Sequence, residues 1–299
     1  MTRTASGTEI PLASGGYRAR LVTVGAGLAG LTLDGHDLTI PHAVDEMPTG
    51  WVGKSLIPWP NRIAGGAFTW RGTAYRVPVN EPERHAALHG LMGWVEWTVV
   101  HADGDSATLG AFVAPREGYP WALESWVTYA LEADTGLTVT LTSRNVGTAT
   151  APYGVSSHPY LTLDLEPNAG WELTVPAASV LDTDDDLTPI ARRPVGALDL
   201  DFREPRLLGD RAIDHAFTDL PEGPWQVSLA SPATGRWVRI ESDARWVQVY
   251  SGDQLGRRGV AVEPMSCAPD AFNSGDGVVA LEPGQSHSLT FRISGGVRE

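Results

Sequence analysis

The sequence predicts an all-β protein, a large antiparallel β-sandwich in which residues 1–299 form a single domain. Three observations support this fold class. Short segments with alternating apolar and polar residues recur along the chain, turn signals separate them at close spacing, and no long segment combines helix caps with a helical period of apolar residues. The 33 Gly and 22 Pro among 299 residues suit a fold with many turns.

The first strands are predicted at residues 17–24 and 31–35, and a glycine-rich segment joins them. Residues 25–30 read Gly-Ala-Gly-Leu-Ala-Gly and match the GxGxxG pattern of dinucleotide-binding turns. That pattern requires a helix directly after the turn, whereas the residues that follow are strand-like and are broken by Gly35. We therefore interpret the segment as a turn between two strands and expect no dinucleotide cofactor.

The proline-rich residues 56–63 predict an irregular path, because proline cannot donate a hydrogen bond inside a central strand. A hairpin is predicted next, at residues 67–70 and 74–77, turned through Arg71 and Gly72. Residues 182–186 are read as a solvated acidic loop, because the glycine and the glutamate of a calcium loop are missing. The later predicted strands cover residues 95–100, 107–113, 123–130, 137–143, 171–175, 226–229, 236–240, 246–250 and 288–293.

Charge and composition exclude several kinds of partner. The formal net charge of −14 argues against nucleic acid, whose backbone is bound by clustered lysine and arginine. The chain contains no run of about 20 apolar residues, and its first residues lack the apolar segment of a signal peptide, so we expect no membrane partner and no export. Cys267 is the one cysteine, which leaves no intrachain disulfide or cysteine zinc site and fits a reducing, cytoplasmic compartment.

His158 and Glu263 stand in contexts that suit acid–base chemistry. His158 follows a serine-rich turn and precedes Pro159, which biases its backbone toward an extended conformation. A single histidine is more often a structural hydrogen-bonding group, and it is the pairing with Glu263 that favours catalysis. Glu263 ends the apolar residues 259–262 and precedes Pro264, so we expect its carboxylate at the end of a buried strand, where it needs partners or a role.

Other residues are candidates for ligand contacts. Arg62 follows two prolines and either presents a fixed fork of donors to a hydroxyl-rich ligand or ties down loop carbonyls. Asp214 either accepts hydrogen bonds from sugar hydroxyls or caps a turn. His89 lies in the loop of residues 80–92. Four aromatic residues beside these positions offer faces to a sugar, or else build core, namely Trp59, Trp94, Tyr160 and Phe217.

Two hydrolase readings fit the same residues less well. Ser156 can share a face of the chain with His158, but no GxSxG nucleophile motif is present. A glycosidase needs two carboxylates, which Glu263 and Asp214 would supply, but this reading leaves His158 and His89 without a role.

Five motifs together resemble the aldose 1-epimerase (galactose mutarotase) family, in order and over nearly the whole chain. The version in this chain is similar to the broad bacterial branch of that family. The motifs are Pro58–Ile63, Leu88-His89-Gly90 with Gly93-Trp94, Ser157–Tyr160, Ile213–Phe217, and Val262-Glu263-Pro264 followed by Pro269–Asn273.

The resemblance implies a role for each motif residue. Glu263 would be the general base that takes the proton of the C1 hydroxyl, and His158 the general acid that protonates the ring oxygen. Arg62 and His89 would contact the ring oxygen and adjoining hydroxyls, Asp214 would bind hydroxyls across the ring, and Asn61 is a weaker candidate for substrate contact. Ordinary pKa values of about 4.3 for Glu and about 6.5 for His would leave the base ionised and the acid partly protonated near neutrality.

The resemblance also implies a small-molecule sugar as partner, no metal or organic cofactor, and a galactose mutarotase-like fold. We expect a monomer or a homodimer that interconverts the anomers of a free aldohexose such as glucose or galactose. Two alternatives stay open. One is a hexose-6-phosphate mutarotase, which would require further basic residues at the pocket, with Arg84, Arg116, Arg257 and Arg258 available. The other is a non-catalytic carbohydrate-binding β-sandwich. The paired Ser156 and Ser157 are expected to support the imidazole of His158.

Overall fold

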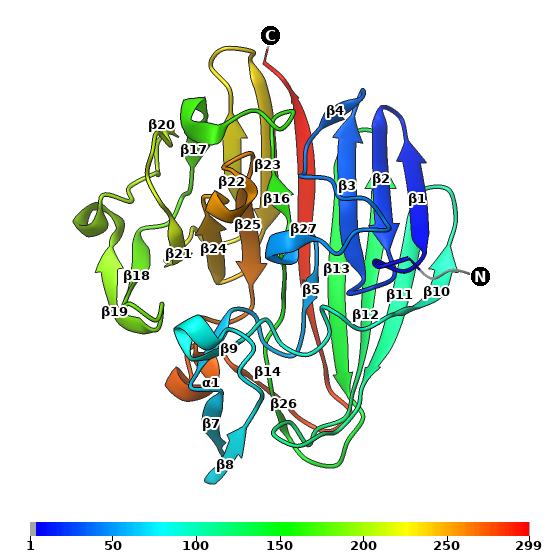
Figure 1. Ribbon diagram of the computed structural model, residues 1–299, viewed down its shortest axis with the longest axis vertical. Helices are drawn as coiled ribbons and strands as arrows, with labels where there is room; N and C mark the ends of the chain where they lie inside the picture. The colour runs from blue at the N-terminus through cyan, green and yellow to red at the C-terminus, as the bar shows by residue number, and fades with distance from the viewer. Residues whose placement is uncertain (1–3, 299) are drawn as a thin grey trace.

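The computed structural model describes residues 4–298, and the regular secondary structure of this part of the chain consists almost entirely of antiparallel β-strands (Figure 1). Its largest sheet has nine strands in the order β10-β11-β12-β13-β27-β23-β22-β17-β20. These strands are β10 (Thr98–Ala102), β11 (Ser106–Val113), β12 (Leu123–Glu132), β13 (Gly136–Asn145), β27 (Ser286–Val297), β23 (Arg236–Ser242), β22 (Trp225–Ala230), β17 (Glu172–Thr174) and β20 (Arg206–Leu207).

A second sheet has the order β19-β18-β21-β24-β25-β15-β5, and the short strand β16 also pairs with β25. Strand β25 is therefore central in this sheet. The bounds are β19 (Pro189–Pro194), β18 (Ser179–Thr183), β21 (Asp214–Thr218), β24 (Trp246–Tyr250), β25 (Val260–Met265), β15 (Ser156–Ser157), β5 (Ser55–Leu56) and β16 (Tyr160–Leu161).

Smaller elements surround these two sheets. A four-stranded sheet contains, in order, β1 (Glu9–Ser14), β2 (Tyr17–Val22), β3 (Gly27–Leu33) and β4 (His36–Asp37). Three further sheets have two strands each. They pair β6 (Arg62–Ala64) with β9 (Ala86–Leu88), β7 (Ala67–Trp70) with β8 (Thr73–Arg76), and β14 (Ala151–Tyr153) with β26 (Val279–Leu281). The helical turns are α1 (Ala271–Ser274), η1 (Thr49–Trp51), η2 (Pro82–Arg84), η3 (Asn168–Gly170), η4 (Val195–Leu198) and η5 (Asp253–Leu255). In residues 4–298, no helix is long or apolar enough to cross a membrane.

Alternating burial packs the sheets together. Along β12, every second side chain from Leu123 to Leu131 is buried, as the period of two in the sequence predicts for a strand with one face toward the core. The four-stranded sheet packs against β11 and β12 and lies beside them in Figure 1. Side chains of β22 and β23 share one apolar core with those of β21, β24 and β25. The two large sheets are thereby joined through their inner faces.

Strand β25 is buried along its whole length, and its two faces differ. Val260 and Val262 belong to the main core between the sheets. Ala261 and Met265, on the opposite face, belong to two smaller apolar clusters. Glu263 lies between them on that second face. The strand thus forms a wall with packed core behind it and a polar site in front of it.

Two expectations need correction. The glycine-rich segment turns at residues 23–26, where Gly25 has a φ of +76°, but β3 already begins at Gly27. The turn between two strands is confirmed, while the later glycines lie inside a strand. Glu263 is the fourth residue of β25 and not its end, because Pro264 continues the strand opposite Val247.

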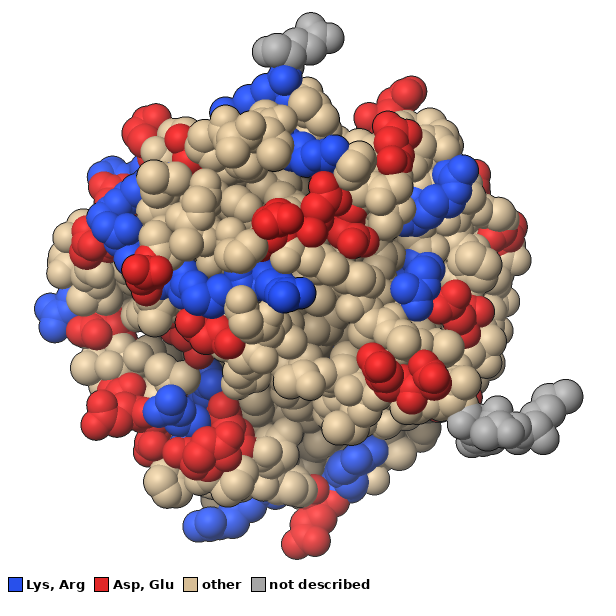
Figure 2. Space-filling view, turned by 45° about the horizontal axis from the view of Figure 1, so that its top comes forward, with Lys and Arg blue, Asp and Glu red and all other residues tan. Residues whose placement is uncertain are grey.

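Charged residues of both signs are mixed on the molecular face shown in Figure 2. Acidic groups lie next to basic ones there, without a continuous basic stripe of the kind that binds a phosphate backbone. The acidic hairpin turn of residues 184–188, between β18 and β19, is closed by its own hydrogen bonds, with Asp184 accepting from the backbone N–H groups of Asp186 and Thr188.

Candidate active site

Three neighbouring strands present the acidic side of the site. Gln248 on β24 lies directly opposite Glu263 on β25, so the two side chains share a face of the sheet. Asp214 begins β21, the next strand, and Nε2 of Gln248 donates to its Oδ1 at 2.6 Å. A carboxyl group, an amide and a second carboxyl group are therefore held in one row by strand register.

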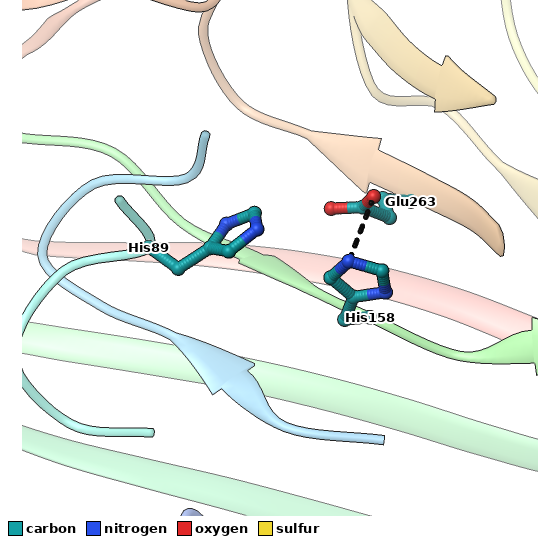
Figure 3. A group of neighbouring side chains, drawn as sticks. All are labelled: His89, His158 and Glu263. Atoms are coloured by element: carbon teal, nitrogen blue, oxygen red, sulfur yellow. Dashed lines mark ion pairs between the residues drawn. The ribbon is translucent and has the colours of Figure 1, made fainter. Parts of the chain in front are cut away.

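His158 lies in front of Glu263, between β15 and β16. Its backbone N–H donates to the carbonyl of Lys54 at 3.0 Å, and its own carbonyl accepts from the N–H of Gly53 at 2.9 Å. The imidazole points to the carboxyl group of Glu263, with Nε2 3.4 Å from Oε1 (Figure 3). The side chains are only 6% and 2% exposed. This distance is longer than a normal hydrogen bond and short enough for direct proton exchange after a small movement.

His89 and Asn61 lock each other in place. The backbone N–H of Asn61 donates to Nδ1 of His89 at 3.1 Å, and the backbone N–H of His89 donates to the carbonyl of Asn61 at 2.8 Å. Because Nδ1 of His89 accepts a hydrogen bond, Nε2 is the nitrogen that carries the proton in the neutral ring. The ring meets that of His158 edge to face, with centroids 5.2 Å apart.

Arg62 is held by a carboxylate rather than by loop carbonyls. Its Nε and a terminal nitrogen donate to the two oxygens of Glu81 at 2.6 Å and 2.8 Å, a bidentate ion pair with side chains 11% and 13% exposed. Its backbone N–H donates to Oδ1 of Asn61 at 2.9 Å. The guanidinium therefore has a fixed orientation before any ligand is bound.

These residues line one cavity of about 670 Å³. All six residues singled out from the sequence lie on its wall, namely Asn61, Arg62, His89, His158, Asp214 and Glu263. Aromatic rings of Trp51, Tyr160 and Tyr250 complete the wall. A cavity of this size, with convergent polar groups and aromatic faces, suits a small polar ring such as a hexose.

Burial controls the protonation of the pair in front of β25. It raises the pKa of Glu263 well above its usual value, Asp214 raises that pKa further, and Arg62 opposes the shift. Burial lowers the pKa of His158 to about 3, and nearby Arg62 lowers it too. Both shifts run against the ionised glutamate and partly protonated histidine expected from ordinary pKa values. They favour the neutral form of each group, with one exchangeable proton between the two.

Burial is also the main cause of the pKa shifts of the other polar groups of the site, His89 and Asp214. Burial lowers the pKa of His89 well below its usual value, and the neighbouring His158 and Arg62 act in the same direction. Burial raises the pKa of Asp214, against the effects of Arg62 and of the hydrogen bond from Gln248. His89 is therefore a neutral donor through Nε2.

Several buried atoms of this cavity lack a hydrogen-bond partner among residues 4–298. They are Nδ1 of His158, Oε2 of Glu263 and Oε1 of Gln248. Buried polar atoms are nearly always paired, so unpaired ones that face a cavity are positioned to bind a ligand. The cavity wall thus provides acceptors, an exchangeable proton and fixed donors.

Comparison with known proteins identifies the family. The sequence model of aldose 1-epimerases matches residues 9–294. The chain belongs to the aldose 1-epimerase family. It is 46% identical over 290 residues to YihR of Escherichia coli strain K12, described as uncharacterized, covering 97% of this chain and 94% of that protein. It is 30% identical over 267 residues to the galactose mutarotase of Mus musculus, and the match covers 78% of this chain and 76% of that protein.

Solved structures of aldose 1-epimerase relatives have the same fold. The GalM/aldose epimerase homologue from C. elegans superposes with a TM-score of 0.88 at 22% identity, covering 98% of this chain and 99% of that one. The galactose 1-epimerase from Lactobacillus acidophilus NCFM superposes with a TM-score of 0.85 at 18% identity, and the match covers 97% of this chain and 95% of that one. At such identities the likeness establishes the all-β, galactose mutarotase-like fold.

Sequence reasoning missed several residues of this candidate site. Gln248, Glu81 and Trp51 stand in no recognisable motif. Gln248 had one signal, since alternation in residues 246–250 places it on one face of its strand, but only the pairing of β24 with β25 turns that face toward Glu263. The four aromatic residues proposed from the sequence as sugar contacts lie in different places. Tyr160 lines the cavity, Trp59 and Phe217 are core residues, and Trp94 is 44% exposed outside the cavity wall.

Ser156, one of the two serines expected to support the imidazole of His158, makes its side-chain hydrogen bonds elsewhere. Ser156 donates through Oγ to the carbonyl of Pro264 at 2.7 Å, which ties β15 to β25. It stabilises the strand that carries Glu263 instead of the imidazole.

His89, His158 and Glu263 also offer ligand atoms that lie within 4.8 Å of one another. Two ligands of a zinc ion stand at most about 4 Å apart, so these side chains would have to move together to share one ion. Their spacing instead leaves room for a substrate oxygen between them.

Proposed function

We propose that this chain is an aldose 1-epimerase that interconverts the α and β anomers of a free aldohexose, glucose or galactose, by acid–base ring opening and reclosure. The observation that carries the proposal is the buried pair of His158 and Glu263, with 3.4 Å between Nε2 and Oε1 on the wall of a polar cavity. The paired acid and base fit a reaction that only moves protons and opens one C–O bond.

The steps follow from the chemistry of the hemiacetal. Glu263, as carboxylate, takes the proton of the C1 hydroxyl, and the electron pair of that O–H bond becomes the C1=O double bond. The bond between C1 and the ring oxygen breaks, and the ring oxygen takes the proton of the His158 imidazolium. Rotation about the C1–C2 bond presents the other face of the aldehyde. Reclosure with the roles reversed gives the other anomer and restores both groups.

The proposal requires one proton on the pair at all times. Burial favours the form with a neutral Glu263 carboxyl and a neutral imidazole, which is the form that the mechanism assigns to the open-chain intermediate. Transfer of that proton to His158 produces the form that opens the ring. Because the ion pair and the neutral pair contain the same number of protons, the cycle needs no proton from solvent.

The other polar groups would bind and orient the sugar. His89 would donate through Nε2, and Arg62, oriented by Glu81, would donate to a hydroxyl or to the ring oxygen. Asp214 and the unpaired Oε1 of Gln248 would accept from hydroxyls across the ring. Asn61 would act mainly through its backbone, because its N–H fixes the tautomer of His89.

A second candidate is a mutarotase for a hexose that carries an anionic group at C6, such as a 6-phosphate. Arg84 favours it, because this arginine lies on the cavity wall and its guanidinium donates to the backbone carbonyl of Asp185 rather than to a carboxylate. Arg257 is tied to Asp253 and to two backbone carbonyls, so it is less free to bind an anion. Arg116 and Arg258 do not lie on the cavity wall.

The direct test is the rate at which freshly dissolved α-glucose and α-galactose equilibrate, followed by polarimetry or one-dimensional proton NMR. The proposal expects faster equilibration with protein and none of that gain with the Glu263→Gln variant. Parallel arms with glucose 6-phosphate and glucuronate test the second candidate, with Arg84→Gln as the variant that loses only the anionic arms. If no sugar equilibrates faster with protein, the enzyme proposal fails.

Binding without turnover would instead identify a carbohydrate-binding module, and release of reducing sugar from a glycoside would identify a hydrolase. The proposal includes a cytoplasmic location, in keeping with the single buried thiol of Cys267. It also includes a monomer or homodimer, which sedimentation would distinguish.

A further inference from the structure

No other residue fixes the orientation of the His158 imidazole by a hydrogen bond to its second nitrogen. Among residues 4–298, Nδ1 is buried without a partner on another residue, and only the backbone of His158 itself acts on the ring by a hydrogen bond, while Nε2 faces Glu263 at 3.4 Å. Histidines that transfer protons are usually oriented through the nitrogen away from the chemistry, by a carboxylate or a carbonyl. A different device must hold this ring.

Aromatic rings enclose the two imidazoles of the site. The Tyr160 ring lies parallel to that of His158, with centroids 4.9 Å apart and an angle of 17°. The edge of His89 meets His158 from another side, at 5.2 Å and 77°. Trp51 packs against His89 at 5.0 Å and 65°. The rings form the row Trp51, His89, His158, Tyr160.

The two ends of this row are tied together. The Tyr160 hydroxyl donates to the carbonyl of Gly50 at 2.9 Å, and Gly50 precedes Trp51 in η1. Gly50 has a φ of +67°, and a Cβ there would lie 3.0 Å from the Tyr160 hydroxyl oxygen. Tyr160 itself is 1% exposed. One hydrogen bond therefore links the Tyr160 ring to the residue that precedes Trp51, and the two imidazoles lie between these rings in the row.

We propose that Tyr160 and Trp51 form an aromatic clamp that positions the imidazole of His158 for proton transfer, with Tyr160 as the main positioning residue. The inference rests on the proposed acid–base function of His158. The parallel ring of Tyr160 holds the imidazole plane, while both ring nitrogens stay free in that plane. It also offers its negative face to the imidazolium that forms when the proton moves from Glu263 to His158.

The decisive variant is Tyr160→Leu, which removes the ring. We expect a fall in kcat of roughly 10- to 100-fold, the cost of a misplaced acid group, with KM changed little. Tyr160→Phe keeps the ring and loses the tie to Gly50, so its kcat should fall by less than about tenfold. Trp51→Leu loosens the far end of the clamp and should also lower kcat more than it raises KM.

The matched controls are Tyr153→Phe and Tyr153→Leu. Tyr153 is also a buried tyrosine, and its hydroxyl also donates at 2.9 Å, to Ser143, but it lies in the core away from the cavity wall. Its substitutions should lower thermal stability as much as those of Tyr160 while leaving kcat unchanged. A general loss of packing would affect both pairs of variants alike.

A second readout does not require turnover. In protein with 13C- and 15N-labelled histidine, the ring signals of His158 are assigned by their loss in His158→Gln. The clamp predicts one narrow set of signals in the wild type and broadened or doubled signals in Tyr160→Leu. If Tyr160→Leu does not fold, Tyr160→Phe and Trp51→Leu are measured in the same way.

The outcomes separate the two ideas. A wild type without mutarotation defeats the proposed function, and the NMR signals then decide the clamp alone. An active wild type whose Tyr160→Leu variant keeps both its kcat and a single narrow His158 signal overturns the clamp. Loss confined to KM in that variant would make Tyr160 a sugar-binding surface and not a positioning residue, which also overturns it.

Discussion

Two of the groups of polar side chains that are buried in residues 4–298 differ in how their hydrogen bonds are completed. Within the core beside β12 and β13, Oγ of Ser125 and Oγ of Ser143 lie 2.7 Å apart, and the Tyr153 hydroxyl donates to Ser143 at 2.9 Å. All three side chains are fully buried. Each hydroxyl has a partner there, so this network completes the fold and needs no ligand.

The second group lies on the cavity wall, and its hydrogen bonds are left open. His158, Glu263 and Gln248 each have a buried side-chain atom without a partner in the described chain. A buried polar atom that stays unpaired costs about 1–3 kcal/mol, so the fold is less stable than it would be with apolar groups there. The difference teaches that completed buried networks serve stability, while incomplete ones that face a cavity indicate where a ligand completes them.

The sharpest way to break this comparison is Glu263→Gln. Removing the base should lower kcat by roughly 10²–10⁴-fold. The midpoint of thermal unfolding should not fall, because a neutral amide replaces a carboxyl group whose charged form is disfavoured by burial. Polarimetry and calorimetry measure the two effects. Retention of full activity would remove Glu263 from the mechanism.

The next effect concerns the amide opposite Glu263. Gln248→Leu removes the donor to Asp214 and an open acceptor of the cavity, so KM should rise roughly tenfold, the equivalent of ~1–2 kcal/mol of binding. The control is Gln226→Leu, an exposed glutamine whose Nε2 donates to Glu241. An unchanged KM for Gln248→Leu would show that its open oxygen does not contact the sugar.

Ser143→Ala tests the completed network. It leaves the hydroxyls of Ser125 and Tyr153 without their shared partner, so the free energy of unfolding should fall by about 1–3 kcal/mol in urea titration. Mutarotation should be unchanged. Thr140→Ala, in the exposed hydroxyl pair with Thr290, should change stability by less than about 0.5 kcal/mol. A loss of activity in Ser143→Ala without loss of stability would contradict the division into two groups.

The smallest expected effect is on the pH dependence of kcat/KM. A second proton on the pair stops the reaction, and the lowered pKa of His158, about 3, places this acid limb far below the ordinary histidine value of about 6.5. Loss of the single proton from the pair also stops the reaction. Because the pKa of Glu263 is raised, this alkaline fall in rate is moved to higher pH. The rate, corrected for the spontaneous reaction, should therefore be flat from about pH 5 to pH 7. A half-drop centred near 6.5 would show that His158 titrates as an exposed histidine.

Much of the architecture could be predicted from local patterns. The alternation in β12 and β13 and the turn signals between them come from neighbouring residues, so they are visible in the sequence. The sheet order was not predictable in this way. Strand β27 pairs with both β13 and β23, and β15 joins β5 to β25, because buried surfaces distant in the chain fit together. Such pairings depend on tertiary packing.

The candidate site was predictable where a residue carries a motif, and not elsewhere. His158, Glu263 and Arg62 stand in motifs that resemble a known family, and they line one cavity as expected. Gln248 and Glu81 became visible only through strand register and an ion pair. The shifted pKa values were also out of reach, because they depend on burial, which no local sequence pattern measures.

The central position of β25 determines when the cavity can be assembled during synthesis and folding of the chain. The cavity wall combines residues from Gly50 to Glu263, and β25 joins its sheet through β24, β15 and β16. Contacts between positions so distant in the chain are slow to form, because the entropy of closing a long loop must be overcome first. A chain still on the ribosome therefore cannot complete the cavity wall until Glu263 has been synthesised. In a refolding experiment, the return of mutarotation would time the final assembly of the sandwich rather than its early collapse.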